Sequence, residues 1–180
     1  MPVPHRPDLY RHVVGLRAVR QFEPTAIRDE EVTAILEAGR WTGSARNLQA
    51  WAFVVLRQQE DIARLAEAGG PNGPLTRATL AIALVRLPDG NEFDLGRVAQ
   101  NMMLAAAARG IGSCPVTLHN QQLASEVLEL PNDENVARRA VVFGYADDGA
   151  EAVARTDRRA AGRAGRKPLS VLVHSGRFGG

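Results

Sequence analysis

Four short apolar runs constrain the fold of this chain more than any other feature. Each has the length of a strand, and helical patterns lie between them. The runs are Trp51–Leu56, Thr79–Leu87, Ile111–Leu118 and Arg139–Tyr145. Because Trp51–Leu56 is continuously apolar and does not alternate, we predict a strand that is buried on both faces. We expect a break at Pro115 in the third run. Together the patterns indicate a mixed fold in which helices enclose a sheet.

Helical patterns occupy most of the chain between these runs. Asp8 and Asp29 stand where N-cap residues of the first two helices are expected. The longest pattern is apolar over much of its circumference, which is typical of a central helix or of a helix packed on a partner subunit, and both remain open. Near the end of the chain, a stretch rich in Ala, Gly and Arg is predicted to be a mobile basic loop. The expected helices are Leu9–Leu16, the segment after Asp29, Gln58–Ala68, Phe93–Arg109 and Gln121–Leu128, and the basic loop is Arg155–Lys167.

Composition excludes several classes of protein. The chain has 180 residues, 45% of them hydrophobic and 23% charged, which is typical of one globular domain. Its net charge of +2 is too small to favour nucleic acid as a main partner. A single cysteine, Cys114, excludes an internal disulfide, and four scattered histidines give no zinc motif. Because no run approaches the roughly 20 apolar residues of a membrane span, we expect a cytoplasmic protein.

A polar loop between a helical pattern and the first strand run is the first candidate site. The stretch Arg40–Phe53 gathers Ser44, Asn47 and Gln49 among small residues that cannot form a core. Such donors and acceptors can converge on a planar polar ligand. The same residues also suit a plain helix-to-strand turn, with Asn47 in a left-handed conformation and Trp51 in the core. The loop by itself leaves both interpretations open.

A second stretch lies about twenty positions upstream and reads Arg17-Ala18-Val19-Arg20-Gln21-Phe22. With the loop Thr42-Gly43-Ser44-Ala45-Arg46-Asn47-Leu48-Gln49-Ala50-Trp51, it resembles the signature of the nitroreductase family of flavin enzymes. That signature is Arg-(Ser)-x-(Arg/Lys)-x-Phe, then a helix, then Ala-Pro-Ser-x-x-Asn-x-Gln-Pro-Trp. Three positions depart from it: Leu16 replaces a frequent Arg, Ala18 the usual Ser, and Ala50 the usual Pro. The first two departures remove usual phosphate contacts.

The resemblance covers nearly the whole chain and implies both a fold and a reaction. The fold is α+β, a nitroreductase-like three-layer arrangement in which helices flank a mainly antiparallel central sheet, with residues 1–180 forming one FMN-binding domain. Family members are intertwined homodimers with shared active sites. The implied reaction moves hydride from NAD(P)H through flavin N5 to a nitroaromatic, quinone or similar flat acceptor. No metal and no catalytic side chain is implied.

The resemblance also assigns binding roles to individual residues. Arg17 and Arg166, with Lys167 beside it, correspond to the phosphate contacts, and Ala18 occupies the adjoining position of the motif. Arg20 corresponds to the basic side chain at the N1/C2 edge of the ring, where a positive charge raises the reduction potential. The family loop gives polar contacts to ring or ribityl from both subunits, and a later proline covers the ring next to a backbone N–H that meets N5. These positions are Ser44, Asn47 and Gln49 in the loop, and Pro115, Val116 and Thr117 after it.

Three other functions stay open at the level of sequence. A relative with the same fold and flavin can be an oxidase or run another reaction of the superfamily. Leu16 and Ala18 make an FMN-binding protein for storage or sensing, without efficient turnover, a second possibility. The basic stretch Arg155–Lys167 alone supports a third, a nucleic-acid-binding module.

Overall fold

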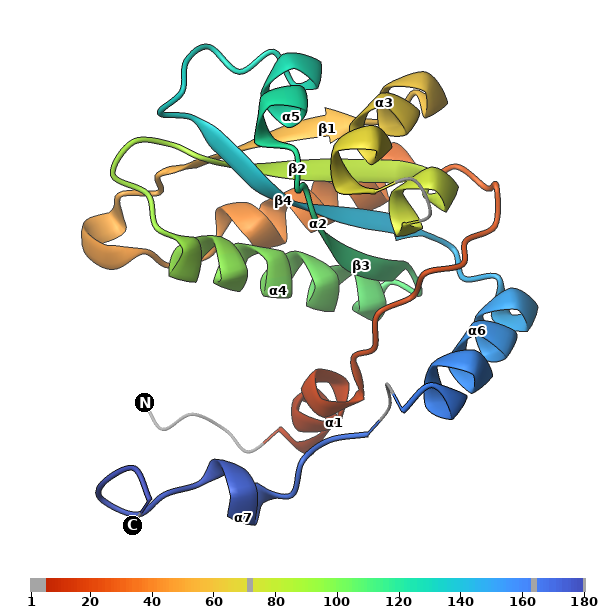
Figure 1. Cartoon of the computed structure of the whole chain (residues 1–180), viewed down its shortest axis with the longest axis vertical. Helices are drawn as coiled ribbons and strands as arrows, with labels where there is room; N and C mark the ends of the chain where they lie inside the picture. Colours follow the sequence, from red (N-terminus) through yellow and green to blue (C-terminus); the bar gives the residue numbers. More distant parts are fainter. Residues whose placement is uncertain (1–5, 71–72, 163–164, 180) are drawn as a thin grey trace. The chain divides into compact units, whose positions relative to one another are not determined.

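The structure is a computed structural model that describes residues 6–70, 73–162 and 165–179 (Figure 1). The chain divides into two compact units, Met1–Asp147 and Asp148–Gly180. None of the described helices combines the length and apolar character needed to cross a membrane. Pro71 and Asn72, which follow the predicted helix Gln58–Ala68, lie outside the described residues.

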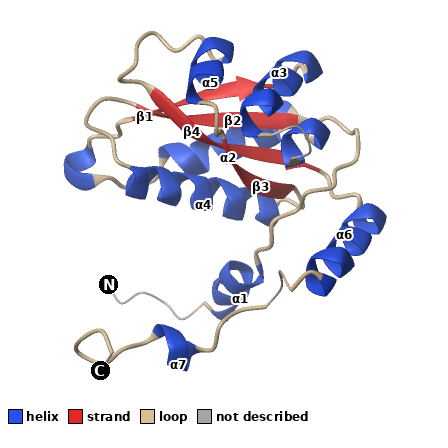
Figure 2. Cartoon of the chain, in the orientation of Figure 1, coloured by secondary structure: helices blue, strands red, loops and turns tan. Residues whose placement is uncertain are grey.

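A four-stranded antiparallel sheet organises the first unit (Figure 2). The strands lie in the order β1-β2-β4-β3, so β2 and β4 are central and β1 and β3 form the edges. The two central strands are buried along most of their length, as their apolar runs predict. The bounds are β1 Trp51–Leu56, β2 Leu80–Arg86, β3 Gly112–Thr117 and β4 Val136–Gly144.

Helices cover both faces of this sheet and complete a three-layer α+β fold. On one face, Ile62 and Leu65 of α3 (Gln59–Gly69) pack with Ala81 and Ala83 of β2, and α5 (Gln121–Val127) joins the same cluster. On the other face, α2 (Asp29–Arg40) and α4 (Glu92–Ala108) pack on Leu80, Ile82 and Leu84 of the same strand. Side chains of β2 alternate between two apolar layers, which is why its sequence is continuously apolar. The α+β class and the antiparallel sheet are confirmed.

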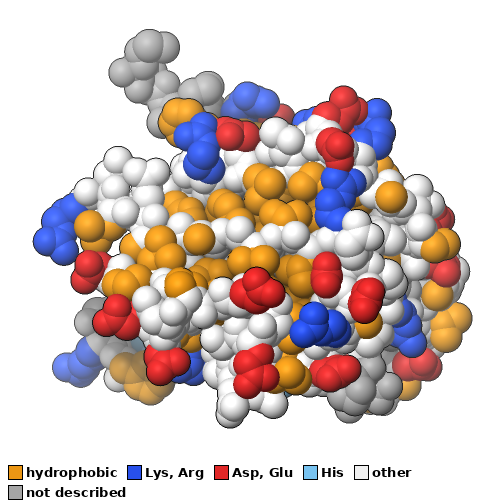
Figure 3. Space-filling model, turned by 90° about the horizontal axis from the view of Figure 1, so that it is seen from above, with side chains coloured by type: hydrophobic (Ala, Val, Ile, Leu, Met, Phe, Trp, Pro, Cys, Tyr) orange, Lys and Arg blue, Asp and Glu red, His pale blue; other side chains and the backbone are white. Residues whose placement is uncertain are grey.

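The prediction that β1 is buried on both faces is wrong. Its first four residues are half-buried and Val55 is exposed. β1 lies at an edge of the sheet, where only one neighbouring strand and part of each helical layer can cover it. Figure 3 shows the molecule from above, relative to Figure 1. Hydrophobic side chains are visible across the middle of the face in this view.

Helix positions agree with the sequence patterns, but two expected caps are absent. Asp8 and Asp29 lie inside the first turns of α1 (Pro7–Gly15) and α2, and neither is the N-cap. Their charges still favour the helix dipole from there. Side-chain caps occur instead at Asn91 of α4 and Asn120 of α5, whose amide oxygens accept a backbone N–H three residues on.

Pro115 does not break its strand, contrary to expectation. It pairs with Val141 inside β3. β3 is an edge strand, and a proline is tolerated where its missing N–H would point out of the sheet.

The segment Arg17–Phe22 lies against the start of β3. Val19 N donates to Ser113 O over 2.9 Å, and Phe22 forms an isolated antiparallel bridge with Ala146. A Cβ added to Gly112 would lie 2.9 Å from Val19 Cβ, so this close approach requires glycine.

The second unit contains α6 (Asp148–Ala160) and α7 (Leu169–Leu172). The prediction of a basic loop is therefore wrong for residues 155–160, which are helical. Alanine and arginine are both good helix formers, and Glu151 pairs with Arg155 and Arg158 on the same helix. Positions 163 and 164 of the expected loop lie outside the described residues.

A buried carboxylate joins α2 to the end of α4. Glu31 is 7% exposed and accepts hydrogen bonds from Arg109 and, over 2.7 Å, from Arg28. The Arg109 hydrogen bond, aided by Arg28, holds the pKa of the Glu31 carboxyl below its usual range, although burial opposes this. Because the folded pKa is lowered, the charged form stabilises the fold above the unfolded pKa, and this contribution is lost as the pH falls.

Glu31→Gln should lower the melting temperature at pH 7 by a few degrees, since both arginines lose their buried partner. The difference from the unsubstituted protein should shrink as the pH falls below about 4.3, the ordinary pKa of a glutamate. Thermal unfolding followed by circular dichroism at several pH values measures both effects. Glu30→Gln is the matched control, because Glu30 is exposed and pairs only across the surface with Arg28. Equal losses in the two variants would contradict this account.

Gly112→Ala should destabilise the protein by about 1–3 kcal/mol, because the new methyl group overlaps Val19. Gly96→Ala is its control: a Cβ there meets nothing within 4 Å, and alanine should add up to about 1 kcal/mol in the middle of α4. Denaturant unfolding compares the two variants. A neutral Gly112→Ala would show that the segment is not held closely against β3.

Candidate cofactor site

The outer edge of β3 has no neighbouring strand among the described residues. Leu118 N donates to Arg138 O of β4 over 3.0 Å. Ser113 O points away from β4 and accepts from Val19 N. Bonding direction alternates along an antiparallel strand, so Thr117, like Ser113, directs its N–H away from β4. Pro115 shares this side and is exposed, and Val116 anchors the strand by packing into the core. Three predicted site residues thus form one ledge at the sheet edge.

A pocket of about 340 Å³ lies beside this ledge, between α1 and the start of β3. Its walls combine apolar residues and glycines with two arginines, a histidine and a serine, and no carboxylate is among the described residues that line it. Ser113 is 1% exposed, and its Oγ has no hydrogen-bond partner among the described atoms. A buried hydroxyl of this kind is costly unless a ligand or water satisfies it. The polar side chains of the lining are Arg11, His12, Arg17 and Ser113.

Arg17 is held at the mouth of this pocket by its own helix end. Its Nη1 donates to Val14 O and to Leu16 O, each over 2.7 Å. Both of these bonds use one nitrogen of the guanidinium, so Nε and Nη2 face no described acceptor and can serve an anion. His12 fixes α1 in place, because its Nε2 is 2.9 Å from Leu104 O of α4.

The rest of the upstream motif has two different environments. Arg20 is half-buried and lies between Val19, which bonds to Ser113 of β3, and Gln21, whose carbonyl accepts from Asp147 N after β4. Ala18 packs against the apolar cluster under α3 and α5. Its methyl group is therefore a core contact, and this position offers no side-chain donor to a ligand.

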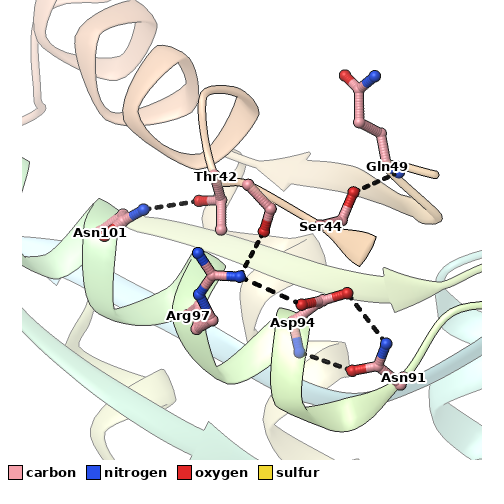
Figure 4. Close-up of polar contacts among 8 residues, drawn as sticks. Thr42, Ser44, Gln49, Asn91, Asp94, Arg97 and Asn101 are labelled. Carbon is pink, nitrogen blue, oxygen red and sulfur yellow. Dashed lines mark hydrogen bonds and ion pairs between the residues drawn. The ribbon is translucent and has the colours of Figure 1, made fainter. Parts of the chain in front are cut away.

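The polar loop has an unusual backbone. Arg46, Asn47 and Gln49 have φ angles of 52°, 55° and 48°, in the left-handed region that non-glycine residues rarely adopt. Ser44 Oγ closes the loop by accepting from Gln49 N over 2.9 Å (Figure 4). Asn47 is left-handed as the turn interpretation predicts, and its side chain and that of Gln49 are exposed.

Two residues of α4 hold this loop and were missed from the sequence. Arg97 Nη1 donates to Gly43 O over 2.6 Å, and Asn101 Nδ2 donates to Thr42 Oγ1 over 2.8 Å (Figure 4). The spacing of Asn91, Asp94, Arg97 and Asn101 puts all four on one side of the helix. This row of polar residues is visible in the sequence, but the rest of the helix is mostly apolar and dominates the pattern.

One chain does not bring all the predicted site residues together. The loop precedes β1 at one edge of the sheet, and the ledge lies on β3 at the other. On α4, Arg97 and Asn101 contact the loop, and Ala107 lines the pocket. Along the helix axis, Ala107 is about 9 Å from Asn101 and about 15 Å from Arg97. Arg166 and Lys167 are exposed residues of the second unit, Asp148–Gly180.

Within the described parts of the chain, no three His, Cys, Asp or Glu side chains gather as metal ligands. Cys114 is buried in the core, as expected for a packed thiol. The polar groups at the ledge and pocket are instead suited to an organic anion.

Comparison with known proteins identifies the family. A family model described as the nitroreductase family matches residues 14–74 and 76–145. A relative from Archaeoglobus fulgidus, named "Putative NADH dehydrogenase/NAD(P)H nitroreductase", is 30% identical over 144 residues, which cover 73% of this chain and 82% of the relative.

Solved structures share the fold. An FMN-dependent nitroreductase from Clostridium difficile R20291 aligns with a TM-score of 0.71 at 22% identity, over 77% of this chain and 88% of that chain. Nitroreductase A from Vibrio parahaemolyticus aligns with a TM-score of 0.79 at 23% identity, over 93% and 76%. The ledge, the loop and the sequence match lead to one conclusion, that this chain belongs to the nitroreductase family.

Proposed function

We propose that this chain is an FMN-dependent oxidoreductase that moves hydride from NAD(P)H to a nitroaromatic, quinone or similar flat acceptor. The observation that carries the proposal is the β3 ledge, where Thr117 N–H points out of the sheet beside the exposed ring of Pro115. FMN, when bound, supplies the hydride relay at N5. The chain's own part is to bind and orient, because positioned donors and cations suffice for such a step.

The residues of the ledge and pocket fit the polar parts of FMN. Arg17 offers unused guanidinium nitrogens for the phosphate, with Arg11 and the Ser113 hydroxyl on the same pocket. We assign Arg20, which follows Val19 in the same segment, to the polar edge of the ring and Thr117 N–H to N5. Arg166 and Lys167 remain candidates for a second phosphate contact from the C-terminal part of the same 1–180 domain.

A complete site requires a second copy of the chain in this proposal. Ser44, Asn47 and Gln49 precede β1 at one edge of the sheet, whereas Thr117 lies on β3 at the other, so we assign the loop to the site of a second subunit. Exposed aromatic side chains flank the loop, with Trp41 and Phe93 each 75% exposed. A homodimer would cover them and bring the loop of one subunit to the ledge of the other.

One observation favours a second function. Ala18 buries a methyl group where the family has a hydroxyl, and Leu16 removes a frequent arginine, so cofactor contacts are fewer. A protein that stores or senses FMN without efficient turnover, or an oxidase of the same superfamily, would tolerate this loss.

Anaerobic addition of NADH or NADPH to the FMN-loaded protein separates these functions. The proposed reductase should lose its flavin absorbance near 450 nm within a turnover time on the order of seconds or less. Stopped-flow absorbance follows the change. A bound flavin that keeps its colour under excess of both nucleotides would refute the reductase and leave the storage function.

Arg17→Gln should weaken FMN binding by about 10- to 150-fold, the range for one charge-assisted contact. Riboflavin, which lacks the phosphate, should bind this variant as it binds the unsubstituted protein. Arg20→Gln should weaken both ligands, because Arg20 is assigned to the ring. Fluorescence titration measures all four affinities, and Arg64→Gln, an exposed arginine of α3, is the control. Equal loss of FMN and riboflavin in Arg17→Gln would place Arg17 away from the phosphate.

A further inference from the structure

The loop Thr42–Gln49 has a backbone shape that is unfavourable by itself. Three non-glycine residues with left-handed φ angles, at positions 46, 47 and 49, make this shape less favourable than an ordinary turn. Residues 45–49 are all exposed, so burial does little to compensate. Such conformations persist when surrounding contacts fix them.

Those contacts come from α4. Arg97 Nη1 is 2.6 Å from Gly43 O, and Asn101 Nδ2 is 2.8 Å from Thr42 Oγ1. Thr42 is 3% exposed and also donates back to Ala38 O of α2 over 3.4 Å. The start of the loop is thus tied to two helices, and the Ser44 bond to Gln49 N closes the rest.

Arg97 is itself directed toward the loop. The side chain of Asp94 is 12% exposed, and its Oδ1 lies 3.5 Å from Arg97 Nη1. Its other oxygen accepts from Asn91 Nδ2 over 3.0 Å, and Asn91 Oδ1 accepts from Asp94 N over 2.8 Å. The guanidinium also lies 5.9 Å from the centre of the Phe93 ring. Figure 4 shows the resulting chain of contacts from the start of α4 to Gly43 O.

We propose that Arg97 and Asn101 are positioning residues, which hold the loop in its ligand-binding shape before any ligand arrives. They touch neither FMN nor substrate, and they act through Ser44, Asn47 and Gln49. This inference rests on the proposed FMN site. A loop fixed in advance loses less conformational entropy when it binds, so removing the contacts lowers affinity without removing any ligand contact.

Arg97→Ala and Asn101→Ala should each weaken FMN binding by about 3- to 20-fold, and Arg97→Lys should recover part of the loss because a cation still reaches Gly43 O. Gln100→Ala, an exposed change on the same helix, is the matched control and should stay within about twofold. Asn101→Ala removes only the Thr42 contact, so it tests the inference even if Arg97→Ala fails to fold.

A double-mutant cycle distinguishes positioning from general destabilisation. Asn47→Gly removes the amide of Asn47 and keeps the left-handed backbone, which glycine adopts readily. If Arg97 acts through the loop, Arg97→Ala should weaken FMN binding less in the Asn47→Gly background than in the unsubstituted protein. Fully additive effects, or FMN affinities like that of Gln100→Ala, would overturn the inference while the FMN site stands. An unsubstituted protein that binds no FMN would instead overturn the proposed function and the inference together.

Discussion

The open outer edge of β3 is the constraint on which the site depends. Native sheets normally cover or block an exposed edge, because unpaired backbone groups invite association with other chains. Here Val19 and its neighbours cover the start of the edge, Pro115 removes one N–H, and Thr117 leaves one pointing outward. The same strand alternation that buries Val116 sets the direction of that N–H. A local rule of sheet geometry therefore produces the donor that the proposed cofactor needs.

Much of the fold could be predicted from the sequence, where local pattern decides structure. β2 and β4 appear as apolar runs because both of their faces are covered, and α4 appears from its length and its period. The exposure of β1 and the tolerance of Pro115 depend on which strands lie at the sheet edges. Strand order is set by contacts between distant segments, and no local pattern reports it.

The sequence proposes a set of site residues, but it does not predict how they are arranged. The motif containing Arg17 and Arg20 identifies the segment, and the structure lays it against β3. Nothing in the spacing of Ser44 or Gln49 indicates that their loop lies at the other sheet edge. The sequence pattern does not single out Arg97 as a loop contact, because most of its helix is apolar. Arg166 and Lys167 stay a prediction, since they belong to the second compact unit.

The central claim is that one cofactor site needs the β3 ledge of one chain and the loop of another. Mixed dimers test it most directly. One chain carries Arg17→Gln with Arg20→Gln, the other carries Asn47→Gly with Gln49→Ala, and the two are co-expressed with different tags and purified together. A shared site predicts one FMN bound per mixed dimer with the affinity of the unsubstituted protein, because one of its two sites receives both intact parts. No tight FMN in the mixed dimer, or a protein that is monomeric at binding concentrations, would contradict the account.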